Sequence, residues 1–136
     1  MTKKGEDLVA SALQRELGLS FRGKYELDGW GTVDDHHRLP DGRVLLLEVE
    51  SAQKHPCTNV LKIWPYLEKH PSLSVILLQV FFPHSPGLTS NRGELGRWLG
   101  LRMKELLGDR FSRFEIVLTH EGEPVSGLEV IRKQLG

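Results

Sequence analysis

The sequence predicts an α/β protein in which a mixed central β-sheet is flanked by helices. Apolar residues recur at helical spacing in residues 5–17, 58–69 and 93–107, and short apolar runs typical of strands lie between these segments. A turn at residues 40–42, Pro-Asp-Gly, joins two of the runs and predicts an antiparallel hairpin. The expected order of elements is α-β-β-β-α-β-α-β-α, which is typical of a layered α/β fold.

Length and composition are those of an ordinary globular protein. We expect residues 1–136 to form one domain, because 136 residues with 39% hydrophobic and 26% charged side chains can enclose a core. Cys57 is the single cysteine, which excludes an intramolecular disulfide and a cysteine-based zinc site. No segment resembles a signal peptide or a membrane span. We therefore expect a cytoplasmic protein with no membrane partner.

The first half of the chain predicts one helix and three strands. The helix covers Gly5–Leu17 and ends at Gly18, a residue that readily adopts the left-handed C-cap conformation. Strands rich in β-branched, aromatic and leucine residues are expected at Phe21–Leu27, Thr32–Leu39 and Arg43–Glu50. A glycine-rich turn at residues 29–31 separates the first two strands.

The second half predicts three helices that alternate with two strands. The helix over residues 58–69 contains Pro65, which either kinks it or marks a later start. The apolar run Leu73–Phe82 is expected to be a strand buried on both faces. A loop, a helix, a strand and a helix complete the chain, at Pro83–Arg92, Gly93–Leu107, Phe114–Thr119 and Pro124–Leu135. The apolar face of the 93–107 helix is expected to comprise Leu95, Trp98, Leu99, Met103, Leu106 and Leu107.

Two glutamates end the third strand. Because side chains alternate between the two faces of a strand, Glu48 and Glu50 share one face. The other face carries Leu45, Leu47 and Val49, and we expect it to be the core face. Two carboxylates held together beside an apolar interior repel each other unless a cation neutralises them. A divalent metal ion is therefore the expected partner of this pair.

Turn chemistry sets the register of the hairpin. A two-residue turn at residues 41–42 would require a backbone N–H from Pro40, and proline has none. A type I turn with Pro40 at its second position and Gly42 in the left-handed region avoids this conflict. That turn pairs Leu39 with Arg43.

Counting back from that pair identifies a third carboxylate. The register places Asp34 opposite Glu48, so we favour Asp34 over Asp35 as the residue that joins the two glutamates. A set of oxygen ligands suits Mg²⁺ or Mn²⁺ rather than zinc. Such an ion lowers the pKa of a bound water and stabilises charge on a phosphoryl oxygen. The alternative is that the three are solvent-facing carboxylates at the edge of an antiparallel pair.

The order of these elements resembles the PD-(D/E)xK nuclease superfamily: a helix, an Asp-bearing strand, a tight turn and a strand ending in Glu48-Val49-Glu50. The resemblance covers roughly residues 5–82 and implies a restriction-endonuclease-like fold. It also implies cleavage of phosphodiester bonds, in DNA in the first place, with Mg²⁺ or Mn²⁺ as cofactor. Asp34 and Glu48 would hold the metal. Glu50 stands where the superfamily has a lysine that assists the nucleophilic water.

The resemblance also implies accessory residues. Some superfamily members use a second glutamate at the lysine position as a base or a ligand, and in others the lysine lies on the following helix, where Lys62 is the candidate. A solvated helix face is the alternative role for Lys62. An acidic residue of the first helix often joins the metal site. Glu6 lies at the inward edge of the apolar stripe and fits this role, although it could instead stabilise the helix dipole. His36 shares the face of Asp34 and is a candidate for a phosphate contact.

Charge distribution adds a further expectation about partners. The net charge is zero, but residues 1–50 carry 7 basic and 10 acidic side chains, whereas residues 51–136 carry 11 and 8. The densest basic stretch comprises Arg92, Arg97, Arg102 and Lys104, which could contact a phosphate backbone or simply form a solvated helix face. We expect nucleic acid as the partner and keep a homodimer open as the assembly. The alternative functions are an inactive nuclease-like binding module and a small-molecule metallohydrolase.

Overall fold

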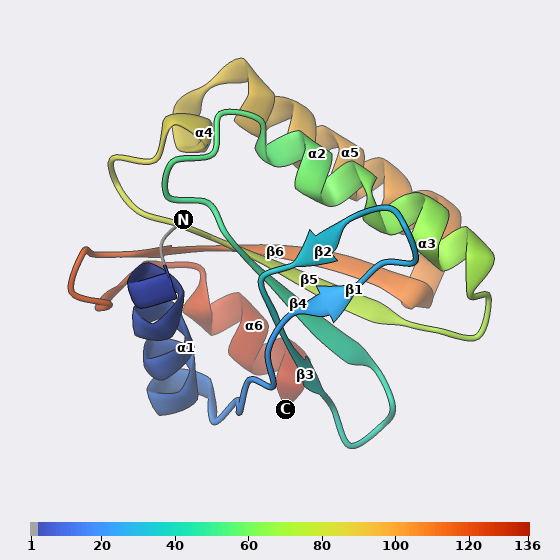
Figure 1. The fold of residues 1–136 in the computed structure, drawn as a ribbon, viewed down its shortest axis with the longest axis horizontal. Coiled ribbons are helices and arrows are strands. Elements are labelled where there is room, and N and C mark those ends of the chain that lie inside the picture. Colours follow the sequence, from blue (N-terminus) through green and yellow to red (C-terminus); the bar gives the residue numbers. More distant parts are fainter. Residues whose placement is uncertain (1–2) are drawn as a thin grey trace.

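A computed structural model describes residues 3–136 and places a five-stranded mixed sheet between two layers of helices (Figure 1). The strands, in their spatial order, are β3 (Asp35–Arg38), β4 (Val44–Val49), β5 (Val75–Phe81), β6 (Phe111–Leu118) and β7 (Pro124–Ser126). β4, β5 and β6 run parallel at the centre, and β3 and β7 pair antiparallel at the edges. The predicted class, a mixed sheet flanked by helices, is confirmed.

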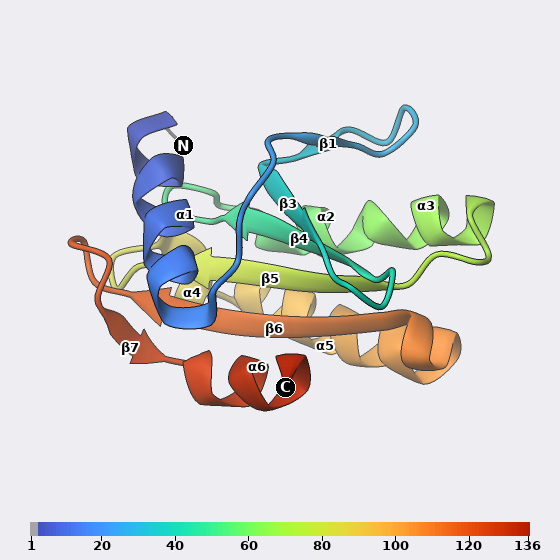
Figure 2. The ribbon, with the colours of Figure 1, turned by 90° about the horizontal axis from the view of Figure 1, so that it is seen from below.

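A small hairpin stands apart from this sheet (Figure 2). It consists of β1 (Tyr25–Glu26) and β2 (Thr32–Val33), which pair antiparallel. The prediction of one continuous strand over Thr32–Leu39 is therefore wrong. This segment forms two strands, β2 and β3, which are divided by a bend at Asp34. The division arises because Val33 pairs with Tyr25 in one sheet while Asp35 pairs with Leu47 in the other.

One face of the sheet is covered by α1 (Lys3–Leu17) and α6 (Leu128–Leu135). Val9 and Leu13 of α1 and Ile131 of α6 are fully buried against the apolar side chains of the strands. The predicted cap of the first helix is confirmed, since Gly18 has φ 71° and its N–H donates to Gln14 O (2.9 Å).

The other face is covered by α2 (Pro56–Leu61), α3 (Ile63–Lys69) and α5 (Asn91–Leu107). Pro65 has no N–H for the carbonyl of Leu61, so the segment predicted as one helix is divided at Lys62. A short helix, α4 (Pro86–Thr89), precedes α5, and a 3₁₀ turn (Gly108–Arg110) follows it. No helix within residues 3–136 is long and apolar enough to cross a membrane.

The predicted hairpin between β3 and β4 is confirmed in turn type and register. Leu39 N–H donates to Arg43 O (2.8 Å), and Gly42 has φ 94°. Asp35 lies opposite Leu47, so Asp34 reaches the position opposite Glu48. The prediction that only one face of β4 is in the core is wrong. Every residue of β4 is buried, because helices cover both faces of a strand that lies inside the sheet.

Three expectations for the second half are corrected. The loop expected at Pro83–Arg92 contains α4, and α5 begins within it, capped by Ser90 Oγ, which accepts from Gly93 N–H (3.3 Å). β6 begins at Phe111 rather than Phe114, because pairing with β5 extends over the polar residues that follow Phe111. The start of the predicted last helix is instead the edge strand β7.

The inward face of α5 also differs from the prediction. Its buried residues are Gly93, Gly96, Gly100 and Met103, whereas Trp98 is 56% exposed. Leu95 and Leu106, also expected in the core, are exposed as well. Glycine faces inward because α5 packs closely on its neighbours. A Cβ at Gly93 would lie 2.0 Å from Gly87 O, and one at Gly100 would lie 2.7 Å from Arg113 Cδ.

We predict that Gly93→Ala destabilises the protein by about 2 kcal/mol or more, because the added methyl group meets a backbone oxygen. Gly96→Ala is the matched control, since its Cβ would lie 3.4 Å from Cys57 Cα. There the gain in helix propensity, about 1 kcal/mol, offsets the tighter packing. Urea denaturation measures both changes in the free energy of unfolding. Equal effects of the two substitutions would contradict this account of the helix packing.

Candidate functional site

A polar cleft of about 360 Å³ lies at the carboxyl end of β4, between the bend that follows β2 and the helix α2. Its lining residues come from three segments: Thr32, Asp34, Glu48, Val49, Glu50, Ala52, Gln53, Asn59 and Lys62. Three of the predicted site carboxylates and the predicted lysine are therefore in one cleft. The carboxyl ends of strands in a parallel sheet are a common location for ligand sites in α/β proteins.

Asp34 is held against the end of β4 by reciprocal hydrogen bonds. Its backbone N–H donates to Glu48 Oε1 (2.9 Å), and its Oδ2 accepts from the backbone N–H of Val49 (2.8 Å). The bend at Asp34 frees this side chain from the regular alternation of a strand. The geometry thus places Asp34, rather than Asp35, beside Glu48.

Glu48 and Glu50 are almost inaccessible to solvent, with 3% and 1% exposure. They lie on the same face of β4 as Val44 and Leu46, which belong to the core beneath α2 and α3. The alternative of solvent-facing carboxylates at a sheet edge is therefore wrong. A buried carboxylate requires hydrogen-bond donors or a cation, and both are supplied here by α2 and the residue after it.

Lys62 provides the cation. Its ammonium group donates to Glu48 Oε2 (3.1 Å), to Thr32 O (2.7 Å) and to Asn59 Oδ1 (2.9 Å). Its side chain is only 16% exposed, so the alternative of a solvated helix face is wrong. Asn59, one helical turn earlier, donates from Nδ2 to Glu50 Oε1 (2.8 Å). The break between α2 and α3 therefore places a lysine and an amide over the two glutamates.

Gln79 is a site residue that sequence reasoning missed. It is fully buried on β5, next to Glu48 in the register, and its Nε2 donates to Glu50 Oε2 and to Pro56 O (3.0 Å). The sequence feature that could have identified Gln79 is its position as the single polar residue of an otherwise apolar strand. A buried side-chain amide must form hydrogen bonds with neighbouring groups of the protein.

Burial is the main cause of the altered acidity in the cleft. Desolvation raises the pKa of Glu48 to about 7, partly opposed by the positive charge of Lys62. Desolvation also raises the pKa of Glu50 to about 7, opposed by the hydrogen bonds from Gln79 and Asn59. Both glutamates are therefore partly protonated near neutral pH, and a second cation beside them would favour their ionised form.

Glu6 of α1 lies next to Asp34. Burial raises the pKa of Glu6, and the negative charge of Asp34 and a hydrogen bond between the two carboxyl groups raise it further. This position agrees with the predicted approach of an acidic side chain from the first helix. Glu6 does not line the cleft itself, but it is bonded to Asp34, which does.

Asp35 and His36 do not line the cleft. Asp35 Oδ1 accepts from the backbone N–H of Gly23 (2.6 Å), and His36 Nδ1 donates to Gly23 O (2.7 Å). His36 also packs on Tyr25, with ring centroids 5.1 Å apart. Both side chains fasten the segment before β1 to β3.

The acidic side chains of the cleft fit a hard divalent cation, since Asp34, Glu48 and Glu50 offer carboxylate oxygens, and Glu6 is bonded to Asp34. Their present arrangement is one of hydrogen bonding. The oxygens of Glu48 and Glu50 are directed at N–H and ammonium donors. Among residues 3–136, no group of three or more acidic, histidine or cysteine side chains has the geometry of a metal site. Binding of an ion would therefore require exchange of some of these hydrogen bonds.

Comparison of the chain with protein-family models, with curated proteins and with solved structures finds no match.

We predict that the free energy of unfolding falls as the pH rises from about 4.5 to about 7, because Glu48 and Glu50 are buried. Their folded-state pKa values, about 7, exceed the ordinary value of 4.5, so the folded protein retains protons that the unfolded chain releases. The stabilisation is complete below about pH 4.5 and is lost as the pH passes about 7. It amounts to at most about 3 kcal/mol for each group. Urea denaturation at several pH values, with a chelator present, measures it.

Glu50→Gln tests the assignment, because glutamine does not titrate. The slope of stability against pH between about 5 and 8 should be smaller in this variant than in the wild type. This window lies above the titration of Glu115, whose pKa is lowered by Arg97 and Arg113 despite its partial burial. An unchanged slope would mean that Glu50 is ionised throughout the window.

Proposed function

We propose that this protein is a divalent-metal-dependent nuclease that hydrolyses phosphodiester bonds, with DNA as its substrate and a restriction-endonuclease-like arrangement of its sheet. The proposal rests on one observation above the others. Lys62, from the break between α2 and α3, lies 3.1 Å from Glu48 in the cleft that also contains Asp34. A lysine is thus available in space although Glu50 occupies the lysine position of the strand motif.

Each polar side chain of the cleft has a distinct role in this proposal. Asp34 and Glu48 would hold Mg²⁺ or Mn²⁺, with Glu6 and Glu50 as further oxygen ligands within reach of the same region. Such an ion supplies a water of lowered pKa and Lewis-acid stabilisation of charge on the phosphate. Lys62 places a positive charge beside the same carboxylates, where it can orient a water or neutralise a phosphate oxygen.

The composition of the cleft lining supports a cation as its ligand. Three carboxyl groups and one ammonium group line the cleft, and the two buried glutamates have pKa values of about 7. Binding of a divalent cation would favour the ionised form of both glutamates and would replace the proton as their counter-charge.

An inactive nuclease-like module is the second candidate, and it also has a supporting observation. The oxygens of Glu48 and Glu50 already accept hydrogen bonds from Lys62, Asn59, Gln79 and the backbone of Asp34. A network satisfied in this way can be purely structural. In that case the protein would retain its fold and bind nucleic acid or protein elsewhere.

Cleavage of labelled DNA distinguishes the two candidates. We predict that the wild type cleaves double- or single-stranded DNA in Mg²⁺ or Mn²⁺ and not in a chelator. Lys62→Met should lower the rate about a hundredfold or more, the usual effect of removing one charge-stabilising donor. Lys69→Met is the control, because Lys69 is an exposed lysine in the last turn of α3 and does not line the cleft. Equal rates in the two variants would refute the role of Lys62.

Metal binding can be measured independently of any substrate. We predict that millimolar Mn²⁺ raises the melting temperature of the wild type, since a ligand that binds only the folded state stabilises it. Glu48→Gln should abolish the rise, because it removes a charged ligand while keeping the side-chain size. The inactive module predicts no rise in either protein.

A further inference from the structure

A series of hydrogen-bonded polar side chains runs from the cleft across one face of the sheet, from the end of β4 over β5 to β6. Glu50, Gln79 and Arg113 follow one another on the same face of β4, β5 and β6, and Glu115 completes the series. Arg113 Nε donates to Gln79 Oε1 (2.6 Å), and its Nη2 donates to Glu115 Oε1 (3.0 Å). Val44 lies on the same face, which is apolar at the start of β4 and becomes polar toward the carboxyl end of the strand.

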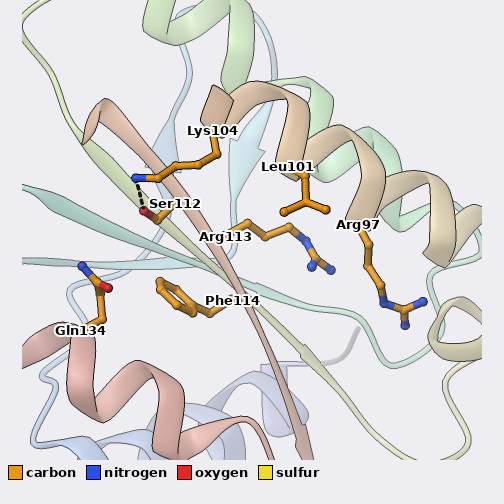
Figure 3. Close-up of a pocket in the computed structure, with 8 residues that line it drawn as sticks. Arg97, Leu101, Lys104, Ser112, Arg113, Phe114 and Gln134 are labelled. Atoms are coloured by element: carbon orange, nitrogen blue, oxygen red, sulfur yellow. Dashed lines mark hydrogen bonds between the residues drawn. The ribbon is translucent and has the colours of Figure 1, made fainter. Parts of the chain in front are cut away.

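Arg113 does not line the cleft itself. It lines a separate hollow of about 400 Å³ beside α5, with Arg97, Leu101 and Lys104 (Figure 3). Its guanidinium group extends toward the Arg97 side of that hollow and away from Lys104 (Figure 3). The side chain is only 10% exposed, so its contacts with Gln79 and Glu115 are made inside the protein.

The donors and acceptors of this series leave Gln79 a single orientation. A guanidinium group can only donate hydrogen bonds, so the side chain of Gln79 must present its oxygen to Arg113. Its amide nitrogen then faces Glu50 Oε2 and Pro56 O, and a backbone carbonyl oxygen can only accept. Reversal of the amide would place an oxygen against a carboxylate. Arg113 and Pro56 O together therefore determine which atom of Gln79 meets Glu50.

We propose that Arg113 and Gln79 are positioning residues for the metal site, and that they hold the Glu50 carboxylate in one orientation without touching the ion or the substrate. This inference rests on the proposed function of the cleft. Without Arg113, the side-chain oxygen of Gln79 loses its charged donor, and the amide that meets Glu50 is held only by its bond to Pro56 O. The buried carboxylate then gains freedom to turn, which weakens a site that depends on fixed ligands.

Arg113→Met and Arg97→Met form a matched pair for the test. Arg97 also donates to Glu115 (2.9 Å) but makes no contact with Gln79. Calorimetric titration of Mn²⁺ into each full-length protein gives the Kd, and urea denaturation gives the stability of the same samples. We expect Arg113→Met to raise the Kd for Mn²⁺ at least tenfold, as loss of such a supporting contact usually does. Arg97→Met should change it less than threefold.

Arg113→Lys keeps a donor and provides the conservative variant, and it also serves if Arg113→Met does not fold. We expect its Kd for Mn²⁺ to lie between those of the wild type and Arg113→Met. If the lysine side chain does not reach Gln79, its Kd should equal that of Arg113→Met. Wild-type affinity in either folded Arg113 variant would overturn the positioning role while leaving the proposed function intact. Absence of Mn²⁺ binding by the wild type would overturn the proposed function and the inference together.

Discussion

Burial of two carboxylates at the end of β4 is the constraint on which the rest of the site depends. Glu48 and Glu50 are at most 3% exposed, and each must recover by hydrogen bonding or charge what it loses in hydration. Lys62, Asn59, Gln79 and the backbone of Asp34 supply these interactions. They come from the bend after β2, from β5, from α2 and from the break that follows α2. Segments distant in sequence therefore meet because one strand ends in two buried glutamates.

The same face of the sheet serves as core at one end and as site at the other. Val44 of β4 and Leu77 of β5 pack beneath the helices. Glu48 and Gln79 lie on the same face, further along β4 and β5. Glu48, Gln79 and Glu115 lie side by side in the register, so one level across β4, β5 and β6 is polar, and Arg113 lies one step nearer the apolar end, beside Leu77. The apolar level stabilises the fold, and the polar level is held rigid by it. This division allows a charged network to be buried in a chain of 136 residues.

Local chemistry explains what the sequence could predict. Proline at position 40 and glycine at position 42 determine the turn, and the turn determines that Asp34 lies opposite Glu48. Features that depend on distant packing were beyond such reasoning. The burial of both faces of β4 depends on helices far along the chain, and the inward glycines of α5 contradict its apolar pattern. Gln79 and Arg113 gain their roles only through pairing of β4, β5 and β6. Lys62 was identifiable as a candidate, but its contact with Glu48 depends on the helix break.

The central claim is that the cleft carboxylates bind a divalent cation. Diffraction from crystals grown with Mn²⁺ tests it most directly, because anomalous scattering locates manganese without reference to activity. The account predicts one peak in the cleft, within direct coordination distance, roughly 2 Å, of oxygens of Asp34 and Glu48. Glu50 or Glu6 should complete the ligand set, with Lys62 still lining the cleft. A cleft without manganese, in which Lys62 keeps its bond to Glu48 at saturating Mn²⁺, would contradict the account.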